Sequence, residues 1–178
     1  MGSAQDGGEK IFRQRDFNAM DPVKFVNLSA ANKPVSLGEK FNGGPDWLRS
    51  TQIRLKNVSS KDIVYIGLEF NFPETKSSGL EMSYRAQLGN MPELPVAFTP
   101  LSLKPQEEAL FSFSDEEYQG LVNFIAHRNL IVSRLNETDL KIGFVVFSDS
   151  TAWGTGIWFK PNPDKRNSWI PISPQPRN

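Results

Sequence analysis

The sequence predicts an all-β protein, an antiparallel β-sandwich of about eight strands with one inserted helix. Three observations support this prediction. Apolar and polar residues alternate through most of the chain, which is the period of a half-buried strand. Turn signals rich in Gly, Pro, Asn, Asp and Ser recur about every ten residues. Only one stretch carries a helical period, and the length of 178 residues suits a single domain.

The alternating segments predict eight or nine short strands. They are 23–30, 35–41, 50–57, 64–72, 80–88, 101–103, 109–113, 140–148 and 153–160. The clearest is 64–72, where Val64, Ile66, Leu68, Phe70 and Phe72 share one face. The segment 140–148 is apolar on both faces, which is typical of a central strand that is covered on both sides.

The exception to the alternating pattern begins at Ser114. Ser114 and Glu117 have the spacing of a capping box, and Asp115 and Glu116 suit the positive end of a helix. Apolar residues then recur at helical spacing: Tyr118, Leu121, Val122 and Ile125. These signals predict a helix over about 115–128.

The two ends differ in composition from the middle of the chain. Residues 1–21 are polar and Gly-rich at first and predict a flexible N-terminal tail, whereas 22–172 forms the single sandwich domain. Residues 173–178 are Pro-rich and predict a C-terminal tail. Ala4-Gln5-Asp6 would suit the residues left by a signal peptidase, so we expect a secreted or periplasmic protein. No apolar run is long enough to predict a transmembrane segment.

Composition excludes several kinds of chemistry. Twenty Lys and Arg balance twenty Asp and Glu, which argues against a nucleic-acid partner. The absence of Cys and the presence of one His remove thiol catalysis, disulfides and multi-His metal sites. We find no phosphate-binding loop, dinucleotide fingerprint or hydrolase motif, so we expect neither a cofactor nor a metal.

Three weaker candidates have simpler structural interpretations. His127 would lie at the end of the predicted helix, where its positive form complements the helix dipole. Glu69 and Glu81 could form the carboxylate pair of a small glycosidase, but outer faces of antiparallel sheets commonly carry such residues. Acids 115–117 suit a helix start better than a calcium loop, which needs alternating ligands and a Gly turn.

Aromatic residues are the one unusual feature. We take Trp47, Trp153 and Trp158 as candidate binding residues, because exposed indoles on β-sandwiches can hold sugar rings or peptides. Trp169 lies near the C-terminus, in a Pro-rich segment that we expect to run extended over the surface of the sandwich. Trp153 and Trp158 are an odd number of residues apart, so in one strand they would lie on opposite faces unless a bulge intervenes. The alternative is that two or three of these residues are core or edge caps.

Several turns resemble those of a known class of domain. Residues 51–63, TQIRLKNVSSKDI, resemble the B–C hairpin of immunoglobulin-like and fibronectin-like domains, and 101–107, LSLKPQE, is similar to a later turn of these domains. Residues 147–159, FSDSTAWGTGIWF, resemble the end hairpin of uncharacterised exported bacterial proteins of this type. The resemblance implies an immunoglobulin-like fold and no particular activity.

These observations favour a non-catalytic interaction module that binds a protein or an envelope partner. The first alternative is a carbohydrate-binding module that uses the three tryptophans, and a small glycosidase is the less favoured one. An interaction module should expose an apolar patch or a long unpaired edge strand.

Overall fold

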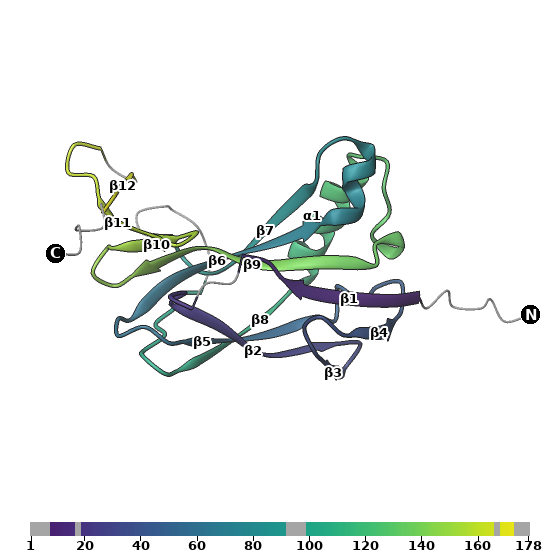
Figure 1. Cartoon of the computed structure of the whole chain (residues 1–178), viewed down its shortest axis with the longest axis horizontal. Helices are drawn as coiled ribbons and strands as arrows, with labels where there is room; N and C mark the ends of the chain where they lie inside the picture. Colours follow the sequence, from purple (N-terminus) through teal and green to yellow (C-terminus); the bar gives the residue numbers. More distant parts are fainter. Residues whose placement is uncertain (1–7, 17–18, 92–98, 166–167, 173–178) are drawn as a thin grey trace, which may run out of the picture.

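The computed structural model describes residues 8–16, 19–91, 99–165 and 168–172. It is all-β with two sheets and one α-helix, as the sequence predicts (Figure 1). The large sheet contains β12 (Trp169–Pro171), β11 (Ile157–Pro161), β10 (Ala152–Gly154), β9 (Glu137–Phe147), β1 (Gly8–Gln14), β4 (Lys40–Gly43), β6 (Ile63–Phe72) and β7 (Met82–Gly89). The small sheet has the order β3 (Lys33–Val35), β2 (Val23–Ala30), β5 (Gln52–Asn57) and β8 (Glu108–Ser112).

Strand β9 is the centre of the large sheet. It pairs with β6 along one side, and on its other side with β1 near its start and with β10 near its end. Strand β7 continues the sheet beyond β6. The prediction that the doubly apolar segment 140–148 is a central strand is therefore confirmed.

The core lies between the two sheets. Phe70 on β6 and Phe111 on β8 are both almost fully buried, and their ring centroids are 5.7 Å apart. Five buried residues of β6 and β5 illustrate how the alternating pattern fills this space: Ile66, Leu68, Phe70, Ile53 and Leu55. A fully buried side chain of this size contributes about 1.5–3 kcal/mol. The alternating pattern thus supplies most of the interior.

Helix α1 (Asp115–Ala126) closes one end of the sandwich beside β7 (Figure 1). The predicted capping box is present: the Ser114 hydroxyl accepts from the Glu117 backbone, and the Glu117 carboxylate accepts from the Ser114 backbone. The helix buries Tyr118, Leu121 and Ile125. It ends two residues before the predicted boundary, with His127 as its C-cap.

The N-terminal segment differs from the tail expected over 1–21. Residues 8–14 form β1, which pairs with β9 in parallel and with β4 in antiparallel orientation, so the large sheet is mixed. Phe12 is fully buried, and Lys10 is 2% exposed. The Lys10 ammonium donates to the carbonyls of Ser133 and Leu135 and to the Asn136 side chain. These acceptors compensate for burying a charged residue that the sequence alone suggests is exposed.

The single strand expected over 35–41 is also different. The structure divides it into β3 and β4, which belong to different sheets. Gly38 lies between them with φ of 82°, a conformation that favours glycine, and its backbone N–H donates to Phe12 O at 2.7 Å. The chain therefore crosses between the sheets at the point where the pattern suggested continuity.

Among the described residues, no helix is both long and apolar enough to cross a membrane. The C-terminal tail expected over 173–178 lies outside the described residues.

Candidate functional site

Trp47 lies in the loop between β4 and β5 and is 1% exposed. Its ring packs against Phe12 and Phe41, with centroids 4.8 and 5.7 Å away. Its indole Nε1 donates to Leu135 O at 3.1 Å. Trp47 therefore joins three separate parts of the chain in the core, and its ring presents no open face to a ligand.

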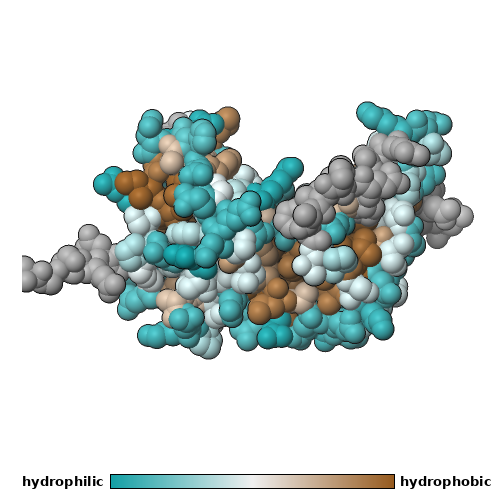
Figure 2. All heavy atoms as spheres, turned by 180° about the vertical axis from the view of Figure 1, so that it is seen from behind, coloured by the Kyte–Doolittle hydropathy of each residue, from teal (hydrophilic) through white to brown (hydrophobic). Residues whose placement is uncertain are grey.

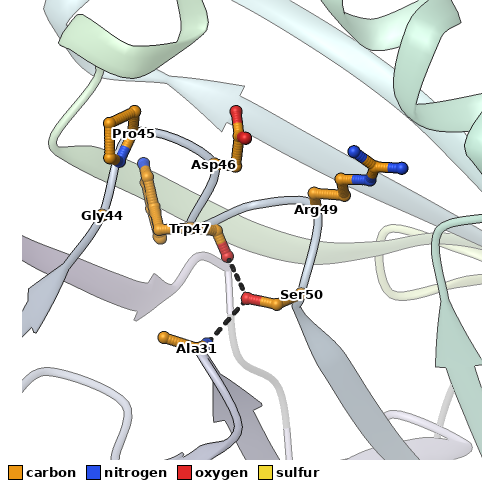
Figure 3. A pocket seen from close by; sticks show the side chains of 7 residues that line it. All are labelled: Ala31, Gly44, Pro45, Asp46, Trp47, Arg49 and Ser50. Atoms are coloured by element: carbon orange, nitrogen blue, oxygen red, sulfur yellow. Dashed lines mark hydrogen bonds between the residues drawn. The ribbon is translucent and has the colours of Figure 1, made fainter.

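A pocket of about 450 Å³ lies beside this loop (Figure 3). Its lining residues are Ala31, Gly44, Pro45, Asp46, Trp47, Arg49 and Ser50. Its polar groups already have partners within the chain. The Ser50 hydroxyl accepts from Ala31 N and donates to Trp47 O. Arg49 points away from Trp47 and pairs with Asp115 at 2.7 Å (Figure 3). These contacts stabilise the loop and leave the pocket without an unpaired charged side chain.

The Tyr118 hydroxyl donates to Asp46 Oδ1 at 3.2 Å and connects α1 to the same loop. Burial, and then the neighbouring Asp46 carboxylate, raise the pKa of Tyr118 to about 12.

This shift predicts a loss of stability at alkaline pH. An unfolded tyrosine has a pKa of about 10, so the unfolded state loses the proton first as the pH rises. The stability that Tyr118 contributes should be complete below pH 10 and should fall between about pH 10 and 12. Urea unfolding of the wild type and of Tyr118→Phe should therefore converge over this range. Parallel pH profiles would contradict the prediction.

Trp153 and Trp158 lie directly opposite each other on β10 and β11. The turn between them has two residues, Thr155 and Gly156, both with positive φ. Because paired residues of antiparallel strands share a face, the two indoles lie on the same face, and the expectation of opposite faces is wrong. Trp153 is 3% exposed, and its Nε1 has no hydrogen-bond partner among the described residues.

Trp158 is half-buried, and neighbouring side chains already contact its ring. It stacks on Phe147 with centroids 5.2 Å apart. The Lys61 ammonium lies 5.7 Å from each of these two ring centroids and pairs with Asp149. Of the three candidate tryptophans, only Trp158 is accessible, and the structure does not bring it together with Trp47 into one site.

A second aromatic group lies on the opposite face of the large sheet. Phe144 on β9 contacts Phe159 and Trp169, with ring centroids 6.1 and 5.5 Å away. The segment 140–148 is apolar on both faces, and this pattern is the sequence signal for aromatic side chains that cover the outer face of the sheet. The outward position of Trp169 depends on the pairing of β11 with β12, which no local pattern predicts.

An apolar hollow with a volume of about 690 Å³ lies between α1 and β7. One wall is formed by consecutive residues 80–84, and the other by residues from a single stripe of the helix and its C-terminal end: Gly120, Asn123, Phe124, His127 and Arg128. We call this set the α1–β7 groove. Leu80 is 72% exposed at its rim. Figure 2 shows apolar side chains gathered at the end of the molecule that carries α1.

Sequence reasoning did not identify this groove. Its two walls are 36 or more residues apart in the sequence, and neither carries a chemical motif. Among the candidates that the sequence suggested, Glu81 and His127 line it. The His127 Nδ1 lies 2.6 Å from Asn123 O, within one helical turn, so this ring is positioned by the helix end.

The proposed glycosidase carboxylates both lie in ion pairs. Glu81 pairs with Arg15 and Lys76, whereas Glu69 pairs with Arg85 at 3.5 Å. The hydrogen bond from Arg15 lowers the pKa of Glu81. A glycosidase general acid needs a raised pKa, so the environment of Glu81 does not suit that role.

Two of the three acids at the start of α1 have structural partners. Asp115 pairs with Arg49, and the Glu117 carboxylate accepts from the backbone N–H of Ser114, the N-cap residue. Within the described part of the chain, no group of three or more His, Cys, Asp or Glu residues could hold a metal ion.

Comparison of the chain with protein-family models, with curated proteins and with solved structures finds no match.

Proposed function

We propose that this chain is a non-catalytic interaction module that binds a protein partner through the α1–β7 groove. The observation that carries the proposal is an apolar hollow of about 690 Å³ alongside β7, an eight-residue edge strand. Strand β7 pairs only with β6 in the part of the chain that the structure describes. Exposed apolar surface and an open sheet edge are the two features that an interaction module should show.

The groove supports a protein partner better than the three tryptophans support a carbohydrate. Trp47 and Trp153 are buried, so neither offers an indole face for stacking on a sugar ring. The groove, by contrast, combines the exposed Leu80 with Phe124 and Tyr84, side chains that suit the apolar anchors of a peptide.

The immunoglobulin-like class of the sandwich and its export by a bacterium are part of the same proposal. They are supported by the turn sequences at 51–63 and 101–107 and by Ala4-Gln5-Asp6. The sequence encoded upstream of Ala4 tests the export proposal: an apolar leader is expected, and its absence from the gene would contradict export.

A charge placed in the groove should abolish partner binding without unfolding the protein. We expect a displayed library of random dodecapeptides to yield peptides that bind the wild type. These peptides should bind the Leu80→Glu variant at least tenfold more weakly. Leu80 is mostly exposed, so this substitution should leave the thermal midpoint nearly unchanged. Titration calorimetry measures the affinity.

The matched control is Ile131→Glu, which places the same charge on another exposed apolar residue, 55% exposed and outside the groove. It should bind the selected peptides as the wild type does. If the library yields no binding peptide, or if both variants bind equally well, the proposed function is wrong.

A further inference from the structure

We infer that the α1–β7 groove binds an extended segment of its partner, which adds as a strand to the edge of β7 opposite β6 and places an acidic side chain beside Arg128. This inference rests on the proposed function and specifies the binding mode and the chemistry of the partner.

The shape of the groove favours an extended strand. One wall consists of five consecutive residues, 80–84, of which Met82, Ser83 and Tyr84 begin β7, so residues of both strand faces border it. Met82 and Tyr84 face the core side of the sheet, where Tyr84 donates to Glu117 O of α1 at 3.0 Å. Ser83 has the opposite orientation in the pleat. A hollow that borders successive residues of one edge strand follows the direction in which another strand would pair.

The length of the groove sets the size of the bound segment. The three strand residues Met82 to Tyr84 extend about 10 Å, and the helix stripe from Gly120 to His127 also extends about 10 Å. Because an added strand advances about 3.3 Å per residue, the groove accommodates roughly three residues. Side chains that point towards the core side would contact Phe124, Tyr84 and Met82.

Gly120 lets the helix pack closely against Tyr84 of β7. A Cβ atom at this position would lie 3.0 Å from the Tyr84 hydroxyl oxygen, which is tight contact. Glycine is disfavoured in a helix interior relative to alanine, and here it permits the close approach of α1 to the Tyr84 hydroxyl.

The charges of the groove favour an acidic partner. Its one acid, Glu81, is paired with both Arg15 and Lys76. Arg128 is exposed and has no ion-pair partner among the residues that the structure describes. The end of the groove near Arg128 therefore has a positive charge that is not compensated, and an acidic side chain there would form a complementary pair.

The test uses the dodecapeptides that bind the groove in the library selection. We expect them to be enriched in alternating apolar and acidic residues. Synthetic peptides from this set should lose at least tenfold in affinity when alternate backbone amides are N-methylated in one register, and much less in the other register. Only one set of amides faces the edge of β7 in an added strand, which explains this difference.

Charge reversal tests the proposed pairing of an acidic side chain with Arg128. Against Arg128→Glu, acidic peptides should bind at least tenfold more weakly, and analogues with Lys in place of the acid should bind better than they do to the wild type. The matched control, Arg134→Glu, reverses an exposed arginine outside the groove and should change neither affinity.

The outcomes separate this inference from the proposed function. The inference is overturned, and the function stands, if peptides lose affinity for Leu80→Glu but keep their affinity when N-methylated in either register. The same holds if reversing the charge of Arg128 leaves their affinity unchanged. If no peptide binds, and dodecanoate or a second copy of this chain occupies the groove instead, both are overturned. Calorimetry with dodecanoate and sedimentation equilibrium detect these two cases.

Discussion

Replacing Trp47 with alanine should lower the free energy of unfolding by about 3–5 kcal/mol, the usual range for removing a buried large aromatic side chain. Trp47 is among the largest fully buried side chains of the protein. It packs on Phe12 from β1 and on Phe41 from β4, and it donates to Leu135 beyond η2 (Val132–Arg134). The cavity would therefore form where β1, the 44–51 loop and the segment before β9 meet.

A second substitution separates the hydrogen bond from the packing. Trp47→Phe keeps an aromatic ring between Phe12 and Phe41 but removes the donor to Leu135 O. The Lys10 ammonium also donates to this carbonyl, at 3.1 Å, so the acceptor stays paired. We therefore expect the lost hydrogen bond to cost only about 1 kcal/mol, with some further loss from the smaller ring.

Trp158→Ala is the matched control, because Trp158 is half-buried and its main contacts are Phe147 and Lys61. Its cost should be clearly smaller than that of Trp47→Ala. Urea unfolding followed by circular dichroism measures all three variants without relying on tryptophan fluorescence. Equal losses for Trp47→Ala and Trp158→Ala would contradict the assignment of Trp47 as the residue that closes the core.

The position of Trp47 shows why a residue type does not predict a binding site. In the sequence, Trp47 follows a Gly-Gly-Pro-Asp loop, which suggests an exposed ring. In the structure the loop folds inward, because Phe12 on β1 provides an aromatic partner from a segment that resembles a tail. The burial of Trp47 thus depends on a long-range contact that neither segment indicates by itself.

The elements that local patterns predicted well are those whose signals are self-contained. The alternation of β6 and the capping box of α1 each need only neighbouring residues, and both are confirmed. The face on which Trp153 and Trp158 lie could not be predicted in the same way. Their spacing suggests opposite faces of one strand, but the two-residue turn at Thr155 and Gly156 places them on paired strands with a shared face.

The candidate groove was outside the reach of sequence reasoning for a physical reason. Its apolar walls come from β7 and α1, where Tyr84 and Phe124 also match the ordinary pattern of core-facing side chains. Only the packing of the helix against the strand end shows that these side chains leave a hollow. Glu81 illustrates the same point, because its ion pair with Arg15 joins the residue before β7 to the segment after β1.

Replacing Gly89 with alanine should destabilise the protein by about 3 kcal/mol or more, since two unfavourable effects coincide at this residue. Gly89 ends β7 opposite Tyr65 and has φ of 77°, which costs other residues about 1 kcal/mol or more. An added Cβ would also overlap the Val64 carbonyl oxygen and lie 2.5 Å from Leu101 Cβ. Neither of these atoms can move aside by a simple rotamer change.

Gly38→Ala isolates the backbone effect. Gly38 has φ of 82°, nearly the same as Gly89, but nothing lies within 4 Å of the Cβ that alanine would add. It should therefore lose only about 1 kcal/mol, the cost of the left-handed conformation alone.

Urea unfolding should rank wild type, Gly38→Ala and Gly89→Ala in order of falling stability. If the two alanine variants lose the same amount, the close approach of β7 to Val64 and Leu101 contributes nothing, and the packing at the end of the β6–β7 pair must be looser than described. If Gly89→Ala loses much more, as we expect, the difference of about 2 kcal/mol measures that close approach directly.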